Sequence, residues 1–225
     1  MLINADFSRR AIVTADQHLW TSSPQAGVER VMLDRLGGEK ARATSIVRYA
    51  PGSYFPAHKH PGGEEILVLS GTFSDNEGDY PAGWYLRNPP GSSHQPYSEP
   101  GAIILVKLWQ MSTETQPLRI NTQDAANWIK RDGRTLCPLF SAADEEVYLE
   151  CLPPGSKVPG LHDKGLEMLV LKGELSHDGQ VFGTGTWLRF PAGESPVATA
   201  AGSGVTLYIK SGHLARMPSQ DTTSC

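Results

Sequence analysis

The same pattern of residues occurs twice along this chain, and the repeat restricts the available folds more than any other feature. The segment GTFSDNEGDYPAGWYLRNPPG, residues 71–91, aligns without a gap with GELSHDGQVFGTGTWLRFPAG, residues 173–193, and three glycines coincide. Upstream, APGSYFPAHKHPGGEEILVLSG matches PPGSKVPGLHDKGLEMLVLKG with one deletion. Because a repeat of this length corresponds to a repeated structural unit, we expect two similar domains, residues 1–115 and 116–225, with the seam near residues 110–119.

The segments that lead into the two copies also agree. Residues 12–20, IVTADQHLW, resemble residues 120–128, INTQDAANW. We therefore expect each domain to begin with an equivalent strand, and the first domain to enter its first strand by about residue 10.

Within each copy the pattern is that of short strands joined by turns. The runs ILVLSG and MLVLKG are typical of buried strands, and SDNEGDYPAG is typical of a hairpin turn. The 23 glycines and 17 prolines are scattered between such runs, which favours tight turns over long helices. We expect an all-β chain that forms two small antiparallel β-barrels in tandem.

Composition excludes several classes of function. The formal net charge is −4, and Lys and Arg form no basic cluster, so nucleic-acid binding is not expected. The longest aliphatic run, AIILV, is too short to cross a bilayer. The three cysteines, Cys137, Cys151 and Cys225, match neither a disulfide framework nor a CxxC zinc site. We expect a cytoplasmic protein with a small-molecule or protein partner.

Residues 58–68 combine metal-binding side chains with an apolar strand. On a strand, residues of equal parity share one face. If the bend at residues 61–63 preserves parity, His58, His60 and Glu64 point inward with the aliphatic residues that follow. Lys59 and Glu65 then point outward. The sequence therefore predicts polar side chains at the mouth of a barrel whose depth is filled by aliphatic ones.

Two imidazoles and a carboxylate in an apolar cup are costly to desolvate unless they are paired or bind a cation. A divalent metal satisfies all three at once. His94 follows a Pro-x-Gly turn at residues 89–91, and this turn would bring it back over the same cup as a fourth ligand.

These residues resemble the two motifs of the cupin superfamily. Residues 52–71, GSYFPAHKHPGGEEILVLSG, fit the first motif, and residues 83–94, GWYLRNPPGSSH, fit the second. The amino-acid sequence of residues 60–101 is similar to that of the ChrR-type cupins, which are known from anti-sigma factors. The resemblance implies two tandem jelly-roll barrels and names His58, His60, Glu64 and His94 as the four metal ligands. Glu65 is the alternative carboxylate, but parity and the six-residue interval before Gly71 favour Glu64.

The second copy lacks this ligand set. The alignment places Leu166 on Glu64 and Pro196 on His94, and His58 has no histidine counterpart. We therefore expect a degenerate second domain without a full metal site. Weak coordination by His162 and Glu167 is the less favoured alternative.

Arg87 lies near the proposed cup, but Arg189 occupies the matching position in the second copy. A residue that persists without the ligands indicates a structural role. We expect Glu65 to pair with Arg87, and Glu167 with Arg189, as cross-strand ion pairs on the outer face, each within about 4 Å.

Several other residues have weaker assignments. Tyr54, Trp84 and Tyr97 are candidates for lining a ligand pocket, with barrel-filling aromatics as the alternative. His18, His177 and His213 are expected at the surface or in loops. The outward leucines need a covering surface, either between the barrels or in a homodimer; they are Leu67, Leu69, Leu169 and Leu171.

The proposed ligand set suits zinc, iron, manganese or nickel, and the resemblance favours zinc. One function compatible with it is a regulatory or small-molecule-sensing cupin. The alternative is an enzyme, such as a dioxygenase, isomerase or hydrolase, in which open coordination positions act on substrate. ChrR-type anti-sigma factors carry an additional N-terminal zinc-binding domain with histidine and cysteine ligands. This sequence has no cysteine before Cys137, so sigma-factor binding is not expected.

Overall fold

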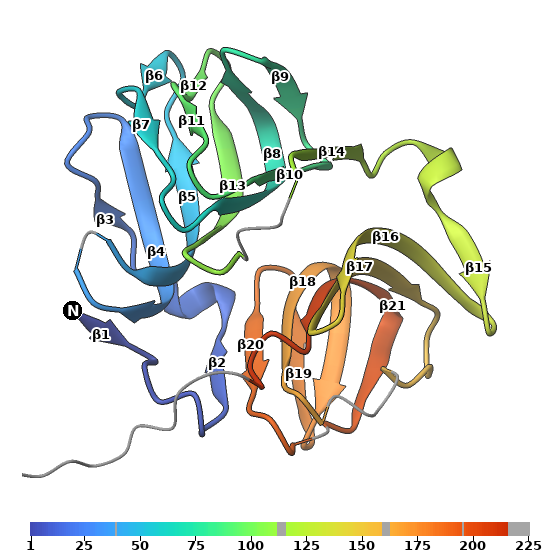
Figure 1. The fold of residues 1–225 in the computed structure, drawn as a ribbon. Coiled ribbons are helices and arrows are strands. Elements are labelled where there is room, and N and C mark those ends of the chain that lie inside the picture. The colour runs from blue at the N-terminus through green and yellow to red at the C-terminus, as the bar shows by residue number, and fades with distance from the viewer. Residues whose placement is uncertain (39, 112–115, 159–162, 195, 216–225) are drawn as a thin grey trace, which may run out of the picture. The chain divides into compact units, whose positions relative to one another are not determined.

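The computed structural model describes residues 1–38, 40–111, 116–158, 163–194 and 196–215. The chain divides into two compact units, and each is built almost entirely of antiparallel strands (Figure 1). Unit 1 consists of Met1–Ala5 and Leu19–Ala125, and unit 2 consists of Asp6–His18 and Ala126–Cys225. The expected all-β architecture with two tandem domains is confirmed.

Unit 1 is a barrel whose main sheet runs in the order β1-β4-β5-β13-β8-β10-β14, with a small β11-β7 sheet beside it. Its strands are β1 (Leu2–Ile3), β3 (Thr21–Ser22), β4 (Val28–Leu36), β5 (Arg42–Tyr49), β6 (Ser53–Tyr54), β7 (His58–Lys59), β8 (Glu64–Asp75), β9 (Gly78–Pro81), β10 (Trp84–Asn88), β11 (Ser93–His94), β12 (Tyr97–Ser98), β13 (Ala102–Leu108) and β14 (Leu118–Asn121).

Unit 2 repeats this order as β15-β16-β17-β21-β18-β20-β2, with β19 paired to β18. Its strands are β2 (Ala11–Val13), β15 (Ile129–Arg131), β16 (Arg134–Ala142), β17 (Glu145–Leu152), β18 (Leu166–His177), β19 (Gln180–Gly183), β20 (Trp187–Phe190) and β21 (Ala198–Ser211). The long strands β8 and β18 have the same length and occupy equivalent places, as the sequence repeat predicts.

The two lead-in strands are exchanged between the repeats. Strand β2, which precedes the first copy, pairs with β20 of unit 2. Strand β14, which precedes the second copy, pairs with β10 of unit 1. The observed units therefore differ from a division at residue 115, because Asp6–His18 belongs to unit 2 and residues 116–125 belong to unit 1. Each barrel keeps an equivalent edge strand, but that strand comes from the other repeat.

Alternation of side chains along the central strands places the core as expected. In unit 1, Ile66 and Val68 of β8 are buried with Leu86 of β10. In unit 2, the equivalent positions are Met168 and Val170, and these are also buried in the core. Each fully buried aliphatic side chain contributes about 1.5–3 kcal/mol to folding, so the repeated pattern supplies both barrels with a core.

One glycine in each repeat is required by close packing of strands. A Cβ atom on Gly71 would lie 1.9 Å from the carbonyl oxygen of Gly101, and on Gly173 it would lie 2.0 Å from that of Gly204. Both residues have positive φ, 70° and 80°. The coincidence of these glycines in the repeat therefore reflects the same backbone approach in both barrels.

The outer face of β8 carries the first of the two predicted ion pairs. Glu65 stands opposite Arg87 in the register, and Arg87 Nη1 lies 3.3 Å from Glu65 Oε2. This pair is confirmed, although both side chains are almost fully buried. Of the leucines on this face, Leu67 and its counterpart Leu169 are buried, whereas Leu69 and Leu171 are partly exposed.

In unit 2, Glu167 stands opposite Arg189 in the register. Glu167 Oε1 accepts a hydrogen bond of 2.6 Å from Trp187 Nε1, and its Oε2 lies 3.1 Å from His213 Nε2. Glu167 is therefore engaged on the outer face rather than turned toward the barrel interior.

Helical structure is minimal in the described residues. It consists of two short 3-10 turns, η1 (Ala15–Gln17) and η2 (Ala125–Asn127). Across the residues that the structure describes, no helix has the length and hydropathy that a membrane span needs.

Candidate metal centre

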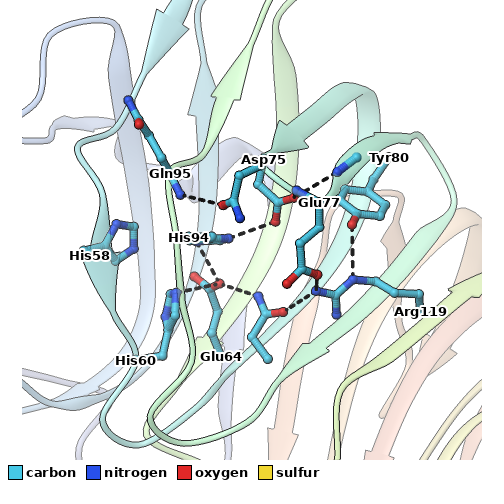
Figure 2. Close-up of polar contacts among 12 residues, drawn as sticks. His58, His60, Glu64, Asp75, Glu77, Tyr80, His94, Gln95 and Arg119 are labelled. Carbon is cyan, nitrogen blue, oxygen red and sulfur yellow. Dashed lines mark hydrogen bonds and ion pairs between the residues drawn. The ribbon is translucent and has the colours of Figure 1, made fainter.

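The four residues singled out by their spacing meet at one end of the first barrel (Figure 2). Strand β7 pairs with β11 so that His58 stands opposite His94. His60 follows β7 directly, and Glu64 is the first residue of β8. One ligand atom from each of the four lies within 4.8 Å of the others. The structure therefore brings together residues that are up to 36 positions apart.

A glycine turn directs His60 and Glu64 toward the same point. The amide of Gly63 donates to the carbonyl of His60 at 3.2 Å, and Gly63 has a φ of 76°. The carbonyl of His60 also accepts from the amide of Gly91 at 2.9 Å. These bonds tie the first motif to the Pro-x-Gly turn of the second, so both motifs are needed to shape the site.

The cluster is buried and its polar atoms are incompletely satisfied. His60, Glu64 and His94 are only 4%, 7% and 6% exposed. The Nε2 atoms of His60 and His94 lie 3.5 and 3.4 Å from Glu64 Oε2, yet neither nitrogen makes a hydrogen bond within the described residues. Buried nitrogens without partners are unfavourable, and a shared cation would satisfy both together with the carboxylate. The donor set therefore fits a divalent metal.

Hydrogen bonds fix the imidazole tautomers in the form that a metal needs. His58 Nδ1 donates to the carbonyl of Pro56 at 2.8 Å. His94 Nδ1 donates to Asp75 Oδ2 at 3.1 Å. Each bond leaves Nε2 free to act as a ligand, and a carboxylate behind a histidine also raises the basicity of the ring.

Burial and neighbouring charges shift the pKa values of two histidines in opposite directions. Desolvation lowers the pKa of His60, and the neighbouring imidazoles reinforce this against the opposing charge of Glu64. Desolvation also acts to lower the pKa of His94, but the hydrogen bond to Asp75 and the charge of Glu64 outweigh it and leave that pKa raised. Asp75 therefore holds His94 as a strong electron donor.

A second set of residues, not identified from the sequence, supports the ligands. Asn88 Nδ2 donates to Glu64 Oε2 at 3.0 Å. Arg119, from the exchanged strand β14, donates to Asn88 Oδ1 at 2.8 Å and to Glu77 Oε2 at 2.8 Å (Figure 2). Arg119, from the lead-in strand of the second repeat, thus holds Asn88, and Asn88 orients the carboxylate of Glu64 in the first repeat.

The repeat itself contains a signal for these supporting residues. At the positions of Asp75 and Asn88, the second copy has His177 and Phe190. Both supporting residues differ between the copies together with the ligands, whereas Arg87 does not. A comparison of the copies for polar residues that change along with the ligands would have selected them.

A cavity of about 130 Å³ adjoins the cluster, and His58 and Glu64 form part of its wall. Most of its other lining residues are apolar, among them Val47, Phe55 and Ile104. The space lies where a small molecule would reach a metal held by the four residues.

The three aromatic residues predicted to line a pocket lie elsewhere. None of Tyr54, Trp84 and Tyr97 belongs to the lining of the cavity. Tyr54 is 53% exposed and pairs with Tyr97 between β6 and β12, and Trp84 packs on the core beside Tyr80, with ring centroids 5.6 Å apart. Tyr54 has the same parity as His58, but parity does not carry across residues 55–57, where the strand is interrupted, and Phe55 lines the cavity instead.

The second barrel has apolar residues at two ligand positions. Leu166, at the position of Glu64, is fully buried in the core, and Pro196, at the position of His94, is also buried. His162, the counterpart of His60, lies outside the described residues. The absence of a full metal site in this barrel remains a prediction.

Two of the histidines predicted at the surface are buried in unit 2. His177 ends β18 with 4% exposure, and its Nδ1 donates to the carbonyl of Val197 at 3.1 Å. The His213 side chain is 4% exposed and contacts Glu167. The prediction of a surface or loop position is wrong for His177, which lies in a strand and is buried. His213 lies in a turn after β21, as the loop alternative predicts, although its ring is buried against Glu167.

Removing the carboxylate behind His94 is expected to weaken metal binding without abolishing it. Asp75→Ala should lower metal affinity roughly 10- to 100-fold, because His94 loses the partner that fixes its tautomer. A competition titration against a chromophoric chelator measures this loss. Asp79→Ala, which removes an exposed carboxylate from neighbouring strand β9, is the matched control and should bind metal as the wild type does. Equal affinities in the two variants would rule out the supporting role of Asp75.

Comparison with known proteins identifies the fold family. The family model of the ChrR Cupin-like domain matches residues 8–112 and again residues 115–215. The chain belongs to the ChrR Cupin-like family. The resemblance noted in the sequence is therefore confirmed, and both copies of the repeat are covered.

Solved structures with cupin folds are similar to the ChrR Cupin-like chain over most of its length. A protein from Nostoc punctiforme, provisionally assigned as a dioxygenase, shares 13% identity at a TM-score of 0.70, covering 94% of this chain and 86% of its own. The bacterial pirin YhhW from Escherichia coli, in complex with nickel(II), shares 15% identity at a TM-score of 0.65, covering 91% and 99%. A cupin 2 conserved barrel domain protein from Leptotrichia buccalis shares 14% at a TM-score of 0.58, covering 85% and 92%.

At these identities the structural likeness establishes the jelly-roll fold alone. Among curated proteins, no sequence matches this chain. The function of this ChrR Cupin-like protein must therefore be argued from its own residues.

Proposed function

We propose that the first barrel binds one divalent transition metal through His58, His60, Glu64 and His94, and that the protein is a metal-dependent sensor of a small molecule. The observation that carries the proposal is the convergence of two buried imidazole nitrogens, without hydrogen-bond partners in the described residues, on one carboxylate. A cation removes this unfavourable arrangement. The hydrogen bonds behind His58 and His94 support the same assignment.

Zinc is the metal we favour. Three imidazoles and one carboxylate also accommodate iron, manganese and nickel, and the pirin from Escherichia coli was solved with nickel(II). Zinc follows from the family resemblance rather than from the donor atoms. The set without thiolates argues against a closed structural zinc site, which usually contains cysteine.

The position of the cavity supports a ligand-responsive role. His58 and Glu64 belong both to the metal-binding cluster and to the cavity wall. A molecule in the cavity would therefore lie next to the metal, and its binding would be sensed at the side chains that hold the ion.

The second candidate is a metal-dependent enzyme, and the same adjacency favours it. A metal with open coordination positions supplies Lewis-acid activation of a bound substrate or water. The protein residues would then confine and orient the substrate in the apolar cavity. Dioxygenase, isomerase and hydrolase reactions are all compatible with this arrangement.

Metal analysis of protein purified without chelators or a nickel column tests the proposal. We expect about one equivalent of metal per chain, and loss of that metal to a strong chelator should lower the melting temperature, since an ion that binds only the folded state stabilises it. Protein that neither retains nor takes up zinc, iron, manganese or nickel would contradict the proposal.

Oxygen uptake separates the sensor from the oxygenase. Bound zinc without turnover supports the sensor. Oxygen consumption that depends on restored iron, measured with an oxygen electrode, would instead support a dioxygenase.

A further inference from the structure

The cavity beside the metal-binding cluster contains an arginine in its wall. Arg30 belongs to β4 and lines the cavity together with Val47 and Ile104. The register places Arg30 opposite Val47, and Val47 opposite Ile104, so the three residues share the inner face of the sheet. The neighbouring Arg48 points to the other face, where its Nε donates to Glu29 at 3.0 Å.

Arg30 has no anionic partner in the described part of the chain. Its Nε is buried without a hydrogen-bond partner, and no described carboxylate lies within ion-pair distance of its guanidinium. A buried donor left unsatisfied is unfavourable, and more so when it is charged. An arginine of this kind inside a cavity indicates that its partner comes from outside the protein.

Tyr49 provides a second free donor in the same cavity. It lies diagonally across from Arg30 on the same sheet face, opposite Val28. Within the described residues its hydroxyl makes no hydrogen bond. Burial, aided by the charge of Glu64, raises the pKa of Tyr49. The phenol therefore stays protonated and can donate to an anion.

The interior of the second barrel contains an arginine that is paired within the protein. In β17, the register places Glu150 where unit 1 has Val47, because Leu152 and Tyr49 occupy equivalent places opposite β21 and β13. Glu150 is fully buried and accepts two hydrogen bonds from Arg134, of 2.6 and 2.8 Å. The register places Leu136 at the position of Arg30 and Arg134 at that of Val28. Unit 2 therefore holds its arginine beside a buried carboxylate, whereas unit 1 has the apolar Val47 opposite Arg30.

We infer that the cavity of the first barrel binds a small monocarboxylic acid, with the carboxylate held by Arg30 and Tyr49 and the remainder directed toward the metal-binding cluster. The inference rests on the proposed metal centre for the second contact. One guanidinium and one neutral phenol balance a single negative charge, which matches a carboxylate better than a phosphate dianion. A volume of about 130 Å³ corresponds to roughly four water molecules, so the acid has only a few carbon atoms.

Titration of the cobalt(II)-loaded protein with acetate, propionate and butyrate, each compared with its neutral amide, tests the inference. Calorimetry should show tighter binding of at least one acid than of its amide. Arg30→Gln should weaken binding of that acid roughly 10- to 100-fold, the effect of losing a charged hydrogen-bond partner, and should leave cobalt content unchanged. Arg30→Lys should restore part of the affinity. Arg48→Gln is the matched control and should behave as the wild type.

Two results would overturn the inference. The first is that no acid binds more tightly than its amide, and the second is that Arg30→Gln binds the acid as the wild type does. Failure of the metal proposal is seen separately, as wild-type protein that takes up no cobalt. In that case the same titrations on metal-free protein decide the role of Arg30, because a preference for acid that Arg30→Gln abolishes would support it and equal affinities would refute it.

Discussion

Replacing His94 with alanine is expected to abolish stable metal retention by this protein. The substitution removes one of four ligands, and it also leaves Asp75 without the imidazole that it orients. Losing a supporting residue alone typically reduces affinity 10- to 100-fold, so the loss of a ligand should exceed about 100-fold. Metal content after gel filtration, measured by mass spectrometry, should fall from about one equivalent to near zero.

His162→Ala is the control for this experiment, because it removes the counterpart of a ligand from the second repeat. We expect it to retain metal as the wild type does. Equal metal content in His94→Ala and His162→Ala would contradict the assignment of the site. Loss of metal only in His162→Ala would move the site to the second barrel.

Replacing Gly71 with alanine is expected to cause the largest loss of stability. The new Cβ would lie 1.9 Å from the carbonyl oxygen of Gly101, and the positive φ of 70° disfavours any residue with a side chain. The obstructing atom belongs to the backbone just before β13, so it cannot rotate away as a side chain would. The two neighbouring backbone segments must therefore move apart. We expect a loss of about 3 kcal/mol or more in the free energy of unfolding, measured by chemical denaturation.

Gly52 offers a control with the same backbone conformation. Its φ is also 70°, but nothing lies within 4 Å of a Cβ atom at that position. Gly52→Ala should therefore lose only the conformational preference, about 1–2 kcal/mol. Gly173→Ala, with a contact of 2.0 Å, should repeat the large effect in unit 2. If Gly52→Ala and Gly71→Ala were equally destabilising, the close backbone approach would not explain why both copies of the repeat have a glycine at this position.

The ligand set could be predicted from sequence because it is encoded locally. Parity preserved across the bend at residues 61–63 places His58 and His60 on the side of Glu64, and a Pro-x-Gly turn returns His94. Short-range geometry of strands and turns decides such positions, and the repeat supplied a comparison in which the ligands are missing. The same reasoning failed for Tyr54, where a break in the strand resets the alternation.

The contacts that the supporting residues make could not be predicted in the same way. Asn88 orients Glu64 from a neighbouring strand, and Arg119 reaches Asn88 from β14. The lead-in segments resemble each other, so the sequence suggests that each serves its own copy. Pairing of β2 with β20 and of β14 with β10 is a choice between two equivalent edges, and local pattern does not distinguish them.

The residues of the chain, taken alone, determined the duplicated all-β architecture and the four converging ligands, because periodicity and turn chemistry act over a few residues. The tertiary structure decided which edge strand completes each barrel, which polar groups stand behind the ligands, and that Arg30 faces the cavity opposite the apolar Val47. These outcomes depend on contacts between strands distant in sequence, whose partners are set only when the whole sheet closes.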